Sequence, residues 1–184
     1  MTNSTLQYRL ATPDDAPQIQ QLVQSAFRTQ DSRPNWTGDT ALAAGFSIGV
    51  EEILTTITTP DSAFLIATDT NGALVASIGI SRHSADFARL FLLAVSDEFQ
   101  RGGIGRQVLA YAEGYCQRIW GVNKGSLNAL SNRLELILWY MRCGYRRTGE
   151  LTPFPVQRVE GSALHEDLCF VEMEKEFNGG SVAA

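Results

Sequence analysis

The sequence predicts an α/β or α+β domain built on a mixed sheet, and three patterns lead to that prediction. Two apolar runs, Ala63 to Ala67 and Leu74 to Ile80, flank the pair Asn71-Gly72, which is the strongest short-range signal for a β-hairpin. A nearly continuous apolar run from Ala88 to Val95 is typical of a strand that is buried on both faces. A helical stripe then follows, so strands and helices mix along the chain. The stripe consists of Ile104, Val108, Ala112, Tyr115 and Ile119.

The remaining elements can be placed in order along the chain. We expect a short first strand at Tyr8 to Ala11. A helix should begin at Thr12 to Asp15, because a capping threonine, an early proline and acidic residues favour a helix start. A weaker helix is expected within Leu42 to Ile57. The later predictions are a strand at Gly125 to Ala129, a helix marked by Leu134, Ile137, Leu138 and Met141 and ended by Gly144, a strand at Tyr145 to Leu151, a loop at Thr152 to Pro155, and a last strand at Asp167 to Phe177.

Composition and charge limit the classes of function that this protein can have. The 184 residues, 44% hydrophobic and 19% charged, fit one globular domain, and no apolar run reaches the ~20 residues that span a bilayer. The polar start lacks a signal-peptide pattern, so we expect a cytoplasmic protein without a membrane partner. A net charge of −5 argues against nucleic-acid binding. Residues 101–147 nevertheless hold eight Lys/Arg against two acids, which suits a small polyanionic ligand. Three scattered cysteines predict neither a metal site nor a disulfide framework.

The segment Gln100-Arg101-Gly102-Gly103-Ile104-Gly105-Arg106 carries the clearest chemical signal. It follows the apolar strand and opens a helix. Its glycines let the backbone turn tightly, and the free N–H groups of a helix start form an anion site. The sequence therefore predicts a phosphate-binding turn. A nucleotide-phosphate binder is disfavoured, because no Lys-Ser/Thr pair follows the glycines and the spacing does not fit a dinucleotide fingerprint.

Two segments resemble the GCN5-related N-acetyltransferase (GNAT) family. Gln100 to Gly105 is similar to that family's Q/R-x-x-G-x-G/A motif, and Trp139 to Tyr145 is similar to its aromatic-Tyr-x-x-x-Gly-aromatic segment. Arg9 to Asp15 also resembles the family's first strand and helix. The resemblance covers roughly Tyr8 to Phe177. It implies a mostly antiparallel central sheet with helices on both faces, in a single domain of residues 1–178, and we expect a disordered tail at 179–184.

The resemblance also implies an activity. The implied reaction is direct transfer of an acetyl group from acetyl-CoA to a primary amine of a small molecule or amino acid, in a ternary complex without a metal. Acetylation of a protein N-terminus or lysine remains an alternative, as does a CoA-binding regulatory module without turnover. The oligomeric state stays open, although many members of the family dimerise. Tyr140 matches the general acid, and the implied coenzyme contacts are Leu93, Ala94, Val95, Gln100, Arg101, Gly102, Gly103, Ile104, Gly105 and Arg106.

The general base and the acceptor pocket are less well defined. Many relatives carry a glutamate on the strand before the pyrophosphate turn, whereas Arg89 stands at about that position here. Three routes for deprotonation of the amine therefore stay open: ordered water, an acidic residue elsewhere in the chain, or loss of the proton before the amine binds. The acceptor pocket is expected to be built from Phe27 to Trp36 and from Thr152 to Pro155. The candidate bases, which the sequence does not rank, are Asp86, His83 and Glu51.

Overall fold

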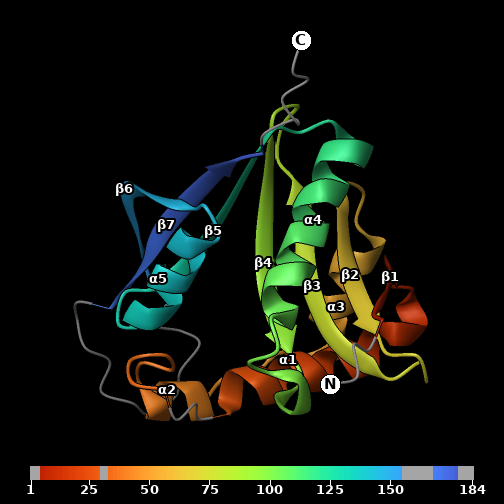
Figure 1. The fold of residues 1–184 in the computed structure, drawn as a ribbon, viewed down its shortest axis with the longest axis horizontal. Coiled ribbons are helices and arrows are strands. Elements are labelled where there is room, and N and C mark those ends of the chain that lie inside the picture. The colour runs from red at the N-terminus through yellow and green to blue at the C-terminus, as the bar shows by residue number, and fades with distance from the viewer. Residues whose placement is uncertain (1–4, 30–32, 155–167, 178–184) are drawn as a thin grey trace.

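The computed structural model describes residues 5–29, 33–154 and 168–177, and these form one seven-stranded sheet with the order β1-β2-β3-β4-β5-β7-β6 (Figure 1). Neighbouring strands are antiparallel, except that β4 and β5 run parallel. The prediction of a mixed, mostly antiparallel sheet is therefore confirmed. The strands are β1 (Gln7–Leu10), β2 (Ser62–Thr68), β3 (Leu74–Arg82), β4 (Phe87–Val95), β5 (Lys124–Leu130), β6 (Arg146–Pro153) and β7 (Cys169–Glu176).

Helices cover both faces of this sheet, as predicted. Helices α4 (Ile104–Trp120) and α5 (Leu134–Arg142) lie on one face, whereas α1 (Ala16–Arg28) and α3 (Val50–Thr58) lie on the other (Figure 1). Each face has its own hydrophobic core. Leu109 of α4 and Ile137 of α5 belong to one core, and Ile19 of α1 and Ile53 of α3 belong to the other. Three short elements complete the described fold: η1 (Pro13–Asp15), α2 (Thr40–Ala44) and η2 (Asp97–Phe99).

Both helices predicted from apolar residues are present, but not every residue that marked them is buried. Both helices are rich in apolar residues on more than one face, and packing against the sheet decides which face is buried. In α4, Ile119 is 62% exposed. In α5, the predicted residues Leu134, Leu138 and Met141 are exposed, and only Ile137 is buried. The buried residues are Val108, Leu109, Ala112 and Cys116 in α4, and Leu136, Ile137 and Tyr140 in α5.

Two other elements also differ from their predictions. The single weak helix expected within Leu42 to Ile57 is divided into α2 and α3, and Gly49 provides the N-cap of α3. Thr152 and Pro153, which were expected in a loop, end strand β6. Proline is tolerated there because β6 is an edge strand, so its missing N–H removes no necessary ladder bond. Pro155, the last residue of that predicted loop, lies outside the described residues, as does the tail at 179–184.

Strand β4 contains an irregularity that shapes the molecule. Leu92 has a φ of +52°, and the β3–β4 register shifts at this point by one extra β4 residue. This bulge inverts the alternation of side chains. Ala88 and Leu90 therefore belong to the α4-side core, whereas Ala94 belongs to the α1-side core.

The parallel contact between β4 and β5 is short. Only Phe87 to Arg89 pair with Lys124 to Ser126. Beyond Arg89 the two strands diverge, and the sheet opens as a V toward the β4–α4 turn (Figure 1). Backbone groups of β4 that face this opening have no β5 partner, and the opening positions the candidate site.

Candidate active site

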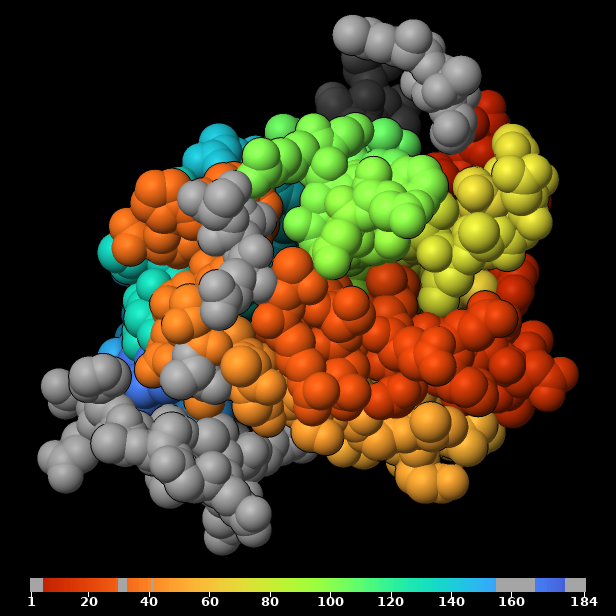
Figure 2. Space-filling model, turned by 90° about the horizontal axis from the view of Figure 1, so that it is seen from below, coloured from red at the N-terminus to blue at the C-terminus, as the bar shows by residue number. Residues whose placement is uncertain are grey.

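A cavity of about 920 Å³ occupies the opening between β4 and β5. Its walls include Leu90 to Val95 from β4, Leu127 to Leu130 from β5, and residues of the β4–α4 turn. Described residues at the end of α1 and between Arg33 and Ser47 form a further wall. Figure 2 views the molecule from this end, with α1 in red and the following segment in orange beside the green β4–α4 turn. The volume is within the range of small-molecule sites.

The β4–α4 turn presents free backbone donors to this cavity. Arg101 and Gly103 have φ values of +68° and +77°, so the chain reverses sharply just before α4 begins at Ile104. Among the described residues, no hydrogen bond uses the backbone N–H groups of residues 102–106. A Cβ placed on Gly103 would meet no atom within 4 Å, so the turn borders open space. This geometry fits a bound diphosphate.

Side chains on either side of the turn hold it in place. Gln100 Nε2 donates to the carbonyl oxygen of Val95 at 3.2 Å and to Asp97 Oδ1 at 3.0 Å. Arg106 Nη2 donates to the carbonyl oxygen of Arg142 at 3.2 Å, which joins the start of α4 to the end of α5. Gly105 lies beside Trp139, and a Cβ there would be in ordinary van der Waals contact with the Trp139 ring at 3.5 Å.

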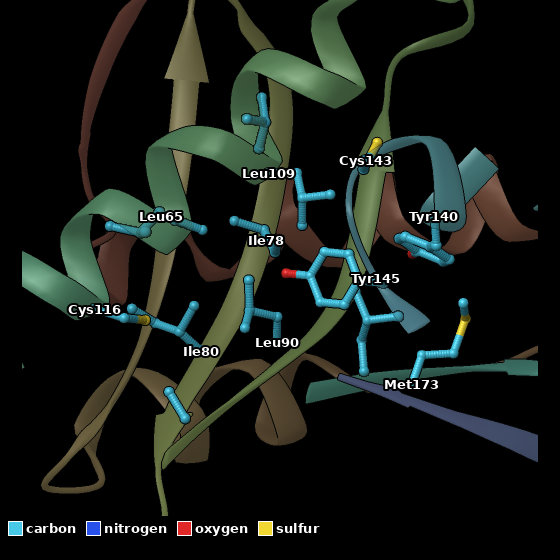
Figure 3. Close-up of a cluster of buried hydrophobic side chains, with 14 of the residues drawn as sticks. Leu65, Ile78, Ile80, Leu90, Leu109, Cys116, Tyr140, Cys143, Tyr145 and Met173 are labelled. Atoms are coloured by element: carbon cyan, nitrogen blue, oxygen red, sulfur yellow. The ribbon is translucent and has the colours of Figure 1, made fainter. Parts of the chain in front are cut away.

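Tyr140 projects from α5 into the core beside the cavity and is only 8% exposed (Figure 3). Its ring lies 5.1 Å from that of Trp139 and 6.0 Å from that of Tyr145, measured between centroids. Burial raises the pKa of Tyr140 to about 12, although the nearby charge of Arg133 acts in the opposite direction. No hydrogen bond from the Tyr140 hydroxyl is present among the described residues. The phenol is therefore protonated at neutral pH and available as a proton donor.

A polar network fixes the chain just after Tyr140. Tyr145 Oη donates to Glu113 Oε1 at 2.9 Å, and Lys175 Nζ donates to Glu113 Oε2 at 2.9 Å. Lys175 Nζ also donates to the carbonyl oxygen of Cys143 at 2.8 Å. Burial, with the adjacent Glu113 carboxylate, raises the pKa of Tyr145 well above its usual value. The network ties α4, α5 and β7 together and so holds α5 at the cavity wall.

The other end of the cavity is rich in aromatic residues. Phe27 and Phe46 stack with centroids 4.7 Å apart, and Trp36 meets Trp139 edge-on at 6.3 Å. Two guanidiniums lie against the Trp36 segment. Arg33 sits 3.7 Å above the Trp36 ring, and Nε of Arg133 donates to the carbonyl oxygen of Trp36 at 2.8 Å. Phe154 and Phe170 add a further ring pair with centroids 5.7 Å apart.

The cavity brings together most residues that the sequence singled out. Every candidate coenzyme contact except Gly102 lines it, and Tyr140 does so as well. From the expected acceptor segments, Phe27, Trp36 and Phe154 are lining residues. Other lining residues, which lie on β5, on β7 and just before α5, were not predicted from the sequence. Their only sequence signal is a polar or large side chain near a strand end, and they include Asn128, Arg133 and Phe170.

None of the candidate bases faces this cavity. His83 and Asp86 are exposed at the β3–β4 connection, where β4 begins, and Glu51 is exposed on α3. The guanidinium of Arg89 pairs with a carboxylate on β7: its Nη1 donates to Glu172 Oε2 at 2.7 Å.

Glu172 is a fixed anion rather than an available base. It also accepts hydrogen bonds from Asn128 Nδ2 at 3.0 Å and Thr152 Oγ1 at 2.8 Å. Burial alone would raise the pKa of Glu172, but the hydrogen bonds from Arg89, Asn128 and Thr152 outweigh burial and lower it. The carboxylate therefore has little affinity for a proton at neutral pH.

Comparison with known proteins agrees with this geometry. The family model described as "Acetyltransferase (GNAT) domain" matches residues 60–147. This region of the chain is therefore similar to a GNAT domain. The matched region runs from the end of α3 to the start of β6, so it contains the β4–α4 turn, Tyr140 and the V-shaped opening of the sheet. No curated protein matches the chain in sequence.

Solved structures show the same fold over nearly the whole chain. Ard1 from Thermoplasma volcanium is similar with a TM-score of 0.70 and 18% identity, over 94% of this chain and 98% of that one. Spermidine N-acetyltransferase from Vibrio cholerae, solved with CoA and spermine, has a TM-score of 0.66 and 15% identity, over 94% and 95%. An IAA acetyltransferase from Bacillus cereus has a TM-score of 0.66 and 14% identity, over 94% and 99%.

Within the described ranges, no group of three or more His, Cys, Asp or Glu side chains is arranged to hold a metal ion. In the same ranges, none of the helices combines the length and apolar character needed to cross a bilayer.

Proposed function

We propose that this protein is an N-acetyltransferase of the GNAT family that takes its acetyl group from acetyl-CoA and gives it to a primary amine. The observation that carries the proposal is the single cavity that joins a turn with free N–H donors to a buried, protonated Tyr140. The backbone of residues 102–106, with Arg101 and Arg106, would hold the pyrophosphate. The unpaired edge of β4 at Leu93 to Val95 would hold the pantetheine arm and polarise the thioester carbonyl.

Tyr140 has the role of general acid in this proposal. The amine nitrogen bonds to the acetyl carbonyl carbon, the carbon–sulfur bond breaks, and the sulfur takes the Tyr140 proton. The nitrogen releases its surplus proton to water, and Tyr140 recovers a proton from solvent. A thiol has an ordinary pKa of ~8.5, below that of Tyr140. The same apolar surroundings would also raise the pKa of the departing thiol, which reduces the mismatch.

The decisive experiment measures thiol release from acetyl-CoA over a panel of amines, with wild-type protein and Tyr140→Phe. We expect acetyl-CoA to bind both proteins equally, because the hydroxyl makes no hydrogen bond among the described residues. Turnover by the variant should fall about 10²- to 10⁴-fold, the usual contribution of a general acid. Unchanged turnover would remove the acid role from Tyr140. Coenzyme binding without thiol release on any amine would instead favour a regulatory CoA-binding module, and release on peptides alone would indicate a protein acetyltransferase.

A further inference from the structure

Strand β5 contributes a polar side chain, that of Asn128, to the lining of the cavity. The last pair of the parallel β4–β5 contact joins Arg89 to Ser126. Asn128 therefore lies two residues beyond that pair, where the two strands have begun to diverge. It stands at the edge of the opening, across from the part of β4 that has no β5 partner.

Asn128 faces the side of the sheet on which α1 lies. Its neighbours Leu127 and Ala129 belong to the hydrophobic core on the α4 side, so alternation along the strand directs Asn128 to the opposite face. Phe27 of α1 packs against the core of that opposite face and also lines the cavity. Tyr140 belongs to the α4-side core. The cavity thus joins the two faces through the opening, with Asn128 on one side and Tyr140 on the other.

Glu172 fixes the orientation of the Asn128 carboxamide. These residues are cross-strand partners on β5 and β7, and Nδ2 of Asn128 donates to Glu172 Oε1 at 3.0 Å. The carboxylate is itself held by Arg89 Nη1 at 2.7 Å and by Thr152 Oγ1 at 2.8 Å. An ionised carboxylate accepts hydrogen bonds and donates none. The inverted amide would place two acceptors against each other, so Nδ2 points to β7 and Oδ1 points away from it.

Oδ1 of Asn128 is the atom that this arrangement leaves for a ligand. Within the part of the chain that the structure describes, no hydrogen bond to this oxygen is present. It is also not among the oxygens that are both buried and unpartnered there, so solvent in the cavity reaches it. Since β5 has β7 on one side and the diverging β4 on the other, an oxygen directed away from β7 is directed toward the opening.

We propose that Oδ1 of Asn128 accepts a hydrogen bond from the attacking nitrogen of the acceptor amine, and that Glu172 acts through Asn128 as a positioning residue. This inference rests on the proposed acetyltransferase function. The thioester carbonyl is proposed to lie at Leu93 to Val95, across the opening from Asn128. A nitrogen held at Oδ1 therefore stands between the amide and the carbon that it attacks.

This hydrogen bond favours the transition state over the bound amine. As the nitrogen bonds to the acetyl carbon it gains positive charge, and its N–H groups become stronger donors. The contact with Asn128 therefore strengthens as the reaction proceeds, which lowers the barrier. A carboxamide neither gives nor takes a proton at neutral pH, so the surplus proton of the nitrogen still leaves to water.

The test measures thiol release from acetyl-CoA with 2-phenylethylamine, n-hexylamine, L-phenylalanine and spermidine, which share a primary amine and differ in the rest of the molecule. Asn128→Leu replaces the carboxamide with an apolar group of similar shape. We expect kcat/KM to fall at least about tenfold, mainly through kcat, with each amine that the wild type uses. The loss should be similar across these amines, because the contact is to the nitrogen that they share. Acetyl-CoA affinity in calorimetric titration should stay at the wild-type value.

Glu172→Gln tests the positioning role. A glutamine donates as well as accepts, so the Asn128 amide is able to invert and present its NH₂ group to the nitrogen. We expect kcat/KM to fall at least about threefold when Asn128 is present. No further loss should follow when Glu172→Gln is added to Asn128→Leu, because the oxygen that Glu172 positions is already absent.

Ser126→Ala is the matched control. Ser126 lies on the same strand and face as Asn128, and its Oγ accepts from Arg89 Nη1 at 3.1 Å, but it does not line the cavity. Its kcat/KM should equal that of the wild type. Thermal unfolding shows whether each variant is folded. Asn128→Ala, which removes the oxygen without adding an apolar branch, replaces Asn128→Leu if the leucine variant does not fold.

The outcomes separate this inference from the function on which it rests. Wild-type kcat/KM in a folded Asn128 variant, with every amine that the wild type uses, would overturn the inference and leave the acetyltransferase intact. An equal loss from Glu172→Gln with and without Asn128 would overturn the positioning role. Absence of thiol release by the wild type with any amine, these four included, would overturn the proposed function itself.

Discussion

Replacing Gly103 with alanine tests the turn directly, because the structure supplies both the magnitude and a matched control. At a φ of +77°, an L-residue costs about 1–2 kcal/mol relative to glycine. For a chain of this length, each kcal/mol lowers Tm by roughly 2–4 °C, so Gly103→Ala should lower Tm by about 2–8 °C. The new methyl group would project into open space at the cavity wall, where the diphosphate is proposed to bind.

Gly72 provides the control. It lies in the β2–β3 hairpin with a φ of +81°, and a Cβ there would also meet no atom within 4 Å. Gly72→Ala should therefore lower Tm by the same amount while leaving the cavity unchanged. Calorimetric titration with acetyl-CoA should show at least about tenfold weaker binding for Gly103→Ala and wild-type binding for Gly72→Ala. Equal coenzyme affinity in both variants would refute the role assigned to the turn, even if both lose the expected stability.

Three further substitutions probe other parts of the structure. Gly79→Ala would place a Cβ in steric overlap with the ring of Phe91, which lines the cavity. This overpacking should lower the free energy of unfolding, measured in urea, by about 1–3 kcal/mol and should also lower kcat/KM. Wild-type stability in the variant would contradict this packing. A hydrogen bond from Arg9 lowers the pKa of Asp15 to about 2. The stability advantage of wild type over Asp15→Asn should therefore be full above pH ~4 and should disappear as the pH falls toward 2. An advantage that does not change with pH would exclude this linkage. Tyr145→Phe removes a buried donor and should lower the free energy of unfolding by about 1–3 kcal/mol; a neutral result in thermal unfolding would show that its bond contributes nothing.

The sequence predicted the parts of the molecule whose signals are local. The glycine-rich bend at 100–105, the Asn71-Gly72 hairpin and the helix start after Pro13 each depend on residues next to one another, and each lies where expected. The order of elements then led to the sheet class. The close agreement at the turn has the same origin, since backbone conformation there is set by the glycines themselves.

The acceptor end of the cavity could not be predicted in the same way. Asn128 and Phe170 come together only because β5 pairs with β7, and Arg133 contacts Trp36 although 97 residues separate them in the sequence. The buried face of α5 could not be read from the sequence either, because the helix is apolar on two faces and only tertiary packing selects one. The sequence singles out Arg89 as a departure from the family pattern, but it does not indicate the partner Glu172, which lies 83 residues further along the chain on β7.

The extra residue at Leu92 makes β4 sensitive to where its length changes. Exchanging one aliphatic side chain for another along this strand leaves each side chain on the same face of the sheet. Deleting Leu92 would remove the bulge but keep Leu93 and Val95 toward α4 and Ala94 toward α1, because the residues after the bulge would keep their partners on β3. Deleting Leu93 instead would leave the bulge in place and move Ala94 into a position that faces α4. A gap of one codon in β4 is therefore more disruptive after Leu92 than at Leu92 itself.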